Sequence, residues 1–194
     1  MEATWRSTWS PASLLWPLGV VASFAYRSLG FIAQRRGAIP QAIPPLERAV
    51  ELCRVAQVWI LFDISAAHLG YAYALSGHLP QGVTLMEEAL ANPEATGTVH
   101  RPLLLAYLGE AHLLVGHRDD AVAAARSALD FAHRQKERGN EAWVLRLFGD
   151  IASQAEPPDP DSAEGYRGAR KCLIRLSFLE ISAPLAGAGE GFEP

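Results

Sequence analysis

Small residues recur in this chain at an interval of about forty positions, and this spacing constrains the fold more than any other feature. Three glycines lie 40 and 39 residues apart, each followed seven residues later by a second glycine. A further small residue follows five positions after that. A fixed period of this length predicts an array of helical pairs. The three copies of the frame are Gly30-Gly37-Ala42, Gly70-Gly77-Gly82 and Gly109-Gly116-Ala121, and Gly149 falls another 40 residues on.

Composition is that of a folded domain with an acidic balance. The 194 residues are 49% hydrophobic and 20% charged, which suffices for a core and does not indicate disorder. A net charge of −4 argues against direct binding to nucleic acid, which needs a basic surface. Cys53 and Cys172 show no CxxC spacing, so they are expected to be a reduced pair in a cytoplasmic protein.

Three segments are expected along the chain. We expect an irregular lead-in over residues 1–19, a helical repeat domain over residues 20–179, and a disordered tail rich in glycine and proline over residues 180–194. Within the repeat domain, apolar residues recur at helical spacing, glycines follow helix ends and prolines stand in first turns. The expected helices cover 20–36, 39–56, 58–76, 80–91, 100–115, 119–137, 141–154 and 162–178.

Residues 7–26 carry no charged side chain. This uncharged stretch is long enough for a membrane span or a signal peptide. Pro11, Pro17 and Gly19 interrupt the stretch, and Glu2 stands where a signal peptide has basic residues. These features favour a cytoplasmic protein over a membrane-anchored adaptor.

The small residues predict close contact between helices. A glycine inside a helix costs about 1 kcal/mol relative to alanine. That cost is acceptable at Gly30, Gly70 and Gly109 if the backbone of a partner helix approaches there. The facing small residues would be Ala42, Gly82 and Ala121, with Ala49, Ala89 and Ala128 seven positions later.

Over residues 22–170 this pattern resembles the tetratricopeptide repeat (TPR). The resemblance lies in Leu29-Gly30, Leu69-Gly70 and Leu108-Gly109 and in the small residues of the second helices. It implies an all-α fold, an α-solenoid of about three and a half to four antiparallel helix pairs in a right-handed superhelix. The long repeat is similar to arrays attached to bacterial nucleotide cyclases, signalling ATPases and maltose-activator-like transcription regulators. The repeat pattern of small residues does not continue after Ser153, because no glycine follows seven residues after Gly149.

The motifs of catalysis and cofactor binding are missing from the sequence. There is no GxSxG, CxxC, HExxH or phosphate-binding loop, so neither an enzyme nor a cofactor is expected. His112 and His117 are five residues apart, which would place them on different faces of one helix. No metal site is therefore expected.

The TPR resemblance implies that the first helix of each pair lines a concave groove. Aromatic and arginine side chains, which anchor protein interfaces, stand at the positions concerned. The sequence thus predicts a non-catalytic module that binds a protein or peptide, as a regulatory or scaffold part of a signalling protein. The predicted partner-binding residues are Arg27, Phe31, Gln34, Arg35, Tyr71, Glu110, Trp143, Arg146 and Asp150.

Alternatives stay open at this point. Phe31, Tyr71 and Trp143 could be ordinary packing between repeats, and the same groove could enclose a small molecule as a sensor domain. The last repeat lacks a polar capping helix, so self-association is expected through Leu173, Leu176 and Phe178.

Overall fold

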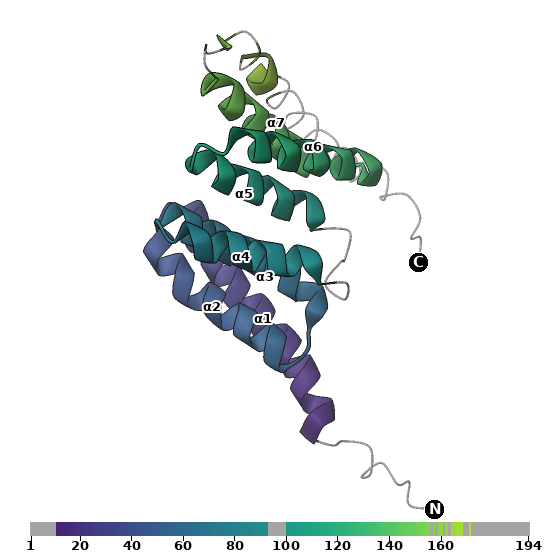
Figure 1. The fold of residues 1–194 in the computed structure, drawn as a ribbon. Coiled ribbons are helices and arrows are strands. Elements are labelled where there is room, and N and C mark those ends of the chain that lie inside the picture. The colour runs from purple at the N-terminus through teal and green to yellow at the C-terminus, as the bar shows by residue number, and fades with distance from the viewer. Residues whose placement is uncertain are drawn as a thin grey trace, which may run out of the picture.

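A computed structural model describes residues 11–92, 100–155 and positions 157, 159, 160, 162, 164–168 and 171. This part of the chain is all-helical and contains no strand. Short further helical stretches lie between 160 and 171. The helices are α1 (Pro11–Arg35), α2 (Ile39–Val55), α3 (Trp59–Leu75), α4 (Leu79–Ala91), α5 (Arg101–Leu114), α6 (Arg118–Gln135) and α7 (Arg138–Ser153) (Figure 1).

The all-α prediction is confirmed, and most helix ends lie within a few residues of those expected. The largest difference is the start of α1, which begins at Pro11 instead of residue 20. Pro17 lies inside this helix, past its first turn, where it removes one backbone hydrogen bond and disfavours a helical backbone in the preceding turn. Gly19 packs so closely on Ala56 that an added Cβ would overlap its side chain. This contact with the end of α2 supports the additional turns, and sequence spacing does not reveal it.

Several sequence-based expectations lie wholly or partly outside the described residues. These are residues 1–10 of the irregular lead-in, Cys172, much of the helix expected over 162–178, the tail at 180–194 and the exposed apolar residues Leu173, Leu176 and Phe178. None of the described helices combines the length and the hydropathy needed to cross a bilayer.

The helices pack in an alternating order. α1 lies against α2, α3 against α4 and α5 against α6, and each pair contacts the next through α2–α3, α4–α5 and α6–α7. α3 also contacts α1 and α5, and α5 contacts α7. The odd-numbered helices therefore follow one another along one side of the molecule, called here the first-helix face, and α2, α4 and α6 form a second layer packed against them (Figure 1).

Glycines in the left-handed region reverse the chain within each pair. Gly37, Gly77 and Gly116 have φ values of +75°, +83° and +78°. The residue after each one donates its backbone N–H to a carbonyl five residues back, as from His78 to Tyr73 at 2.9 Å. This is the Schellman geometry, and it confirms these glycines as helix C-caps.

The helical glycines permit close contact, as the repeat frame predicted. A Cβ at Gly70 would lie 2.8 Å from the carbonyl oxygen of Gly82, and one at Gly109 would lie 3.3 Å from that of Ala121. Gly109 also makes room for Leu147 of α7, at 2.8 Å. The third glycine therefore serves contact between repeats as well as contact within its pair.

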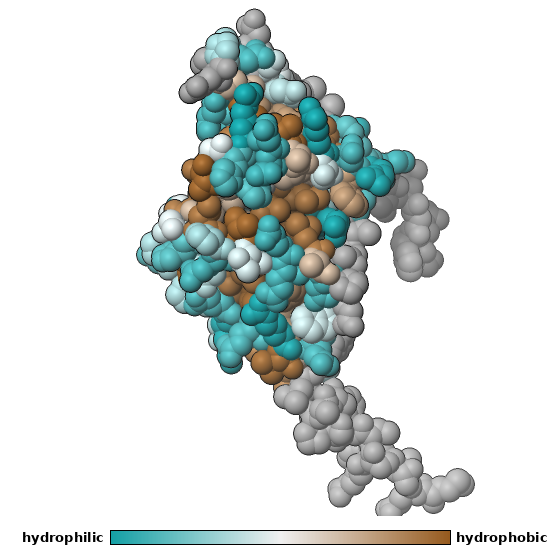
Figure 2. Space-filling view, viewed as in Figure 1, coloured by the Kyte–Doolittle hydropathy of each residue, from teal (hydrophilic) through white to brown (hydrophobic). Residues whose placement is uncertain are grey.

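Two groups of buried side chains form the core. One joins α2, α3, α4 and part of α5, and the other joins α5, α6 and α7. Trp143 packs against both groups. Figure 2 shows apolar side chains in a band where α4 lies beside α5, between surfaces that are mostly polar. The packing is therefore continuous from one helical pair to the next.

Asp63 is an ionisable side chain inside this core, with 2% of its surface exposed. Its Oδ1 accepts a hydrogen bond from the backbone N–H of Ile64 at 2.6 Å, and Oδ2 has no partner among the described residues. Burial raises the pKa of Asp63 from 3.8 to about 7. The carboxylate form is therefore unfavourable in the folded chain.

Asp63→Asn is expected to stabilise the protein in a pH-dependent way. Between pH 4 and 7 the folded chain keeps a proton on Asp63 that the unfolded chain has released, so stability falls as the pH rises through this window. Asparagine removes this penalty, and we expect it to raise the free energy of unfolding by about 2 kcal/mol at pH 8 and only slightly at pH 4. Urea denaturation at both pH values measures the effect. An equal gain at both would contradict ionisation as its cause.

Candidate functional site

Four rings form a path across the first-helix face, one from each helix. Phe31 of α1 lies 5.1 Å from His68 of α3, and His68 lies 5.6 Å from Tyr107 of α5. Tyr107 in turn meets Trp143 of α7 edge-on, with ring centroids 5.6 Å apart. Tyr71 stacks on Tyr107 at 4.3 Å with nearly parallel planes. Aromatic contacts therefore connect all four helices.

The repeat frame explains these positions. In the first three repeats the helical glycine faces the partner helix, and in all four the next residue is rotated from it by about 100° around the helix axis. That next residue is Phe31, Tyr71, Glu110 or Asp150 in the successive repeats. The glycine spacing that predicts the packing therefore also determines which side chains reach the first-helix face.

Glu110 is the centre of the polar contacts. It accepts a hydrogen bond from the Tyr71 hydroxyl at 2.5 Å and one from the Trp143 indole N–H at 2.8 Å. It also forms an ion pair with Arg146. Only 8% of Glu110 is exposed, so these three donors replace water around its carboxylate. Burial and the charge of Glu110 raise the pKa of Tyr71, which keeps that hydroxyl protonated as a donor.

A second polar contact joins α1 to α3. The side-chain amide of Gln34 donates to the backbone carbonyl of His68 at 3.3 Å, and its oxygen lies 2.9 Å from His68 Nδ1. Burial, with a smaller effect from the charge of Arg27, lowers the pKa of His68 to about 3. His68 is therefore neutral at physiological pH, and neutral Nδ1–H can donate to the Gln34 oxygen.

Arginine side chains border the ring path. The guanidinium carbon of Arg35 lies 5.8 Å from the centroid of the Trp143 ring, and that of Arg146 lies 4.7 Å from it. Arg146 also donates to Asp150 at 3.0 Å. Arg27 is half-buried over the ring of Phe24, further toward the N-terminus of α1. All of the predicted site residues except Arg27 thus belong to one connected set of contacts.

The structure differs from the sequence-based prediction in how far these residues are exposed. Gln34 and Glu110 are 9% and 8% exposed, so they hold neighbouring helices together and offer little surface to a partner. His68 and Tyr107 are central to the ring path but were not predicted. Each stands two residues before a helical glycine, but the same position holds Ser28 and Leu147 in the other repeats, so comparing repeats does not single out His68 and Tyr107.

A cleft of about 240 Å³ lies beside the polar contacts, between the C-terminal ends of α3, α5 and α7. Leucine side chains line it together with the charged and amide groups of α5 and α7. Leu75 and Leu114 are 42% and 57% exposed at its edge. The lining residues are Tyr71, Leu75, Glu110, Leu113, Leu114, Arg146, Asp150, Ser153 and Gln154.

The sequence matches no protein-family model and no curated protein. The function is therefore inferred from the first-helix face itself.

Proposed function

We propose that the chain is a TPR-like α-solenoid and a non-catalytic interaction module that binds an extended peptide segment on the first-helix face. The alternating helix contacts and the glycine turns support this architecture. The module would act in the cytoplasm as a regulatory or scaffold part of a signalling protein.

The observation that carries the proposal is the cleft at the end of the ring path. Three helices, α3, α5 and α7, line this cleft, and Arg146, which lies against the ring of Trp143, stands on its polar side. Aromatic and arginine side chains supply most of the binding energy in many interfaces. Phe31 and Ile32 extend the apolar surface along α1, where 38% and 47% of their areas are exposed. An extended peptide could contact both regions.

The size of the cleft favours a peptide side chain over a free small molecule. Pockets for drug-sized ligands are about 300–1,000 Å³, and this one is about 240 Å³. At this cleft a small-molecule ligand is therefore the weaker candidate. Thermal-shift screening tests it, because a saturating ligand raises the apparent stability.

The lining also indicates which side chain would fit. Leu75 and Leu114 offer apolar contact, whereas the side chain of Asp150 is 37% exposed and can accept a further hydrogen bond beside Arg146. Glu110 already accepts from three donors. This combination favours a lysine, arginine or glutamine of the peptide, with its aliphatic stem on the leucines and its donor at Asp150.

Selection from a displayed peptide library, followed by affinity measurements on variants, tests the proposal. We expect Arg35→Ala and Asp150→Ala to weaken binding of the selected peptides about tenfold, a loss typical of a contributing interface residue. Arg48→Ala on α2 and Glu87→Ala on α4 are the controls, because both residues are exposed on the opposite layer. Equal affinity for all four variants and the unchanged protein would contradict binding on the first-helix face.

A further inference from the structure

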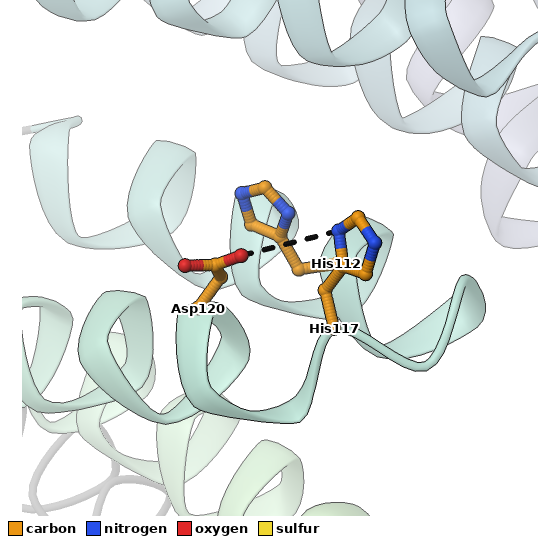
Figure 3. A group of neighbouring side chains, drawn as sticks. All are labelled: His112, His117 and Asp120. Atoms are coloured by element: carbon orange, nitrogen blue, oxygen red, sulfur yellow. Dashed lines mark ion pairs between the residues drawn. The ribbon is translucent and has the colours of Figure 1, made fainter.

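Two histidines and an aspartate meet at the turn between α5 and α6. Figure 3 shows His112 at the end of α5, His117 after the turn and Asp120 in the first turn of α6, grouped on one side of the chain. One nitrogen or oxygen atom from each residue lies within 4.8 Å of those of the other two. His112 is partly buried, and the other two residues are exposed.

Backbone geometry brings the two histidines together. α5 ends at Leu114, and Gly116 then reverses the chain with φ +78°. The backbone N–H of His117 donates to the carbonyl of His112 at 3.0 Å, and the two rings lie at 26° with centroids 6.3 Å apart. Nδ1 of His117 is 3.9 Å from Oδ2 of Asp120. The expectation that His112 and His117 lie on different faces is wrong, because the helix ends between them.

The same turn occurs twice more in the described chain, with other side chains. The positions equivalent to His112, His117 and Asp120 are Ala33, Ala38 and Gln41 at the first turn, and Tyr73, His78 and Gln81 at the second. Among these three glycine turns, only the turn between α5 and α6 has a histidine or a carboxylate at each of the three positions. These are the side chains that could bind a metal ion. Turn geometry therefore does not require this set of residues.

We propose that this turn binds a divalent transition-metal ion such as Zn²⁺ through His112, His117 and Asp120. Imidazole nitrogens and carboxylate oxygens are ordinary zinc ligands. Tetrahedral Zn²⁺ with bonds of about 2.1 Å holds its ligand atoms about 3.4 Å apart. The present separations of up to 4.8 Å would have to close by up to about 1.4 Å through side-chain rotation to reach this arrangement. Solvent or a partner supplies the fourth ligand.

Bound metal would link the end of α5 to the start of α6. It would hold the turn that precedes the second helix of this pair and so raise the stability of the folded chain. Protons compete with metal for imidazole nitrogens, so affinity should fall as the pH is lowered from 7.5 toward 5.5. This proposal does not depend on peptide binding at the first-helix face.

Calorimetric titration of the full untagged chain with ZnCl₂ at pH 7.5 tests the site. We expect one equivalent of zinc to bind, with affinity lowered at least about tenfold by His117→Ala or Asp120→Ala. Two matched controls should bind within about twofold of the unchanged protein. His78→Ala alters the equivalent turn histidine, and Asp119→Ala removes the neighbouring first-turn carboxylate.

Circular dichroism of each variant without metal should match that of the unchanged protein, because His117 and Asp120 are exposed. The visible absorption spectrum of bound cobalt(II) provides a second measurement, because it depends on the nitrogen and oxygen ligands of the metal. The His117→Ala and Asp120→Ala variants should lose this spectrum. Zinc binding that is unchanged in the His117→Ala/Asp120→Ala double variant would overturn the proposal. Failure of the unchanged protein to bind zinc would do the same.

Discussion

Gly82→Ala is expected to lower the free energy of unfolding by about 3 kcal/mol. A Cβ at this position would overlap the carbonyl oxygen of Gly70 and lie 3.2 Å from the backbone nitrogen of Ala74. Backbone atoms of a packed helix cannot rotate away as a side chain can, so α3 and α4 would have to separate. This cost exceeds the gain of about 1 kcal/mol that alanine brings over glycine in a helix.

Gly139→Ala is the matched control. Gly139 lies in the first turn of α7, and a Cβ there would meet nothing within 4 Å. We expect this change to be neutral or to stabilise by up to about 1 kcal/mol. Urea denaturation of both variants gives the comparison. Similar stabilities for Gly82→Ala and Gly139→Ala would show that α3 and α4 do not approach as closely as described.

Glu110→Ala should also cost about 3 kcal/mol, because it removes one partner from a buried ion pair. The hydroxyl of Tyr71 and the indole N–H of Trp143 would lose their acceptor. Arg146 would keep its bond to Asp150, which places the loss at the lower end of the range for buried pairs. Chemical denaturation measures the change.

Two further variants separate the causes of this loss. Glu110→Gln keeps the shape and one acceptor oxygen without the charge, so it should cost less than Glu110→Ala. Glu88→Ala breaks an exposed ion pair with Arg54 and should cost about 0.5 kcal/mol. If Glu110→Ala were no more damaging than Glu88→Ala, the polar contacts around Glu110 would not hold α5 to α3 and α7.

The features predictable from the sequence are those with a local cause. Gly37, Gly77 and Gly116 end helices because each adopts a left-handed backbone that glycine favours. Gly70 and Gly82 carry no side chain where the backbones of α3 and α4 meet. The spacing of these glycines therefore predicts where the helices lie in the sequence. Most of the predicted site residues lie in the odd-numbered helices, which form the first-helix face.

What the sequence did not reveal depends on contacts between distant segments. The early start of α1 depends on Gly19 packing against Ala56. The burial of Glu110 depends on how closely α7 approaches α5, which no spacing within one helix specifies. The meeting of His112 with His117 depends on the residue at which α5 ends, and one residue more or less would change it.

The most direct test of the proposed function is to map a bound peptide by nuclear magnetic resonance. The labelled protein is titrated with a peptide obtained by display selection, and shifts of backbone amide signals are followed. We expect the largest changes around the cleft, at Tyr71, Leu114 and Asp150, and little change at Glu87 or Arg126 on the opposite layer. Changes concentrated on α2, α4 and α6 would contradict peptide binding by the first-helix face.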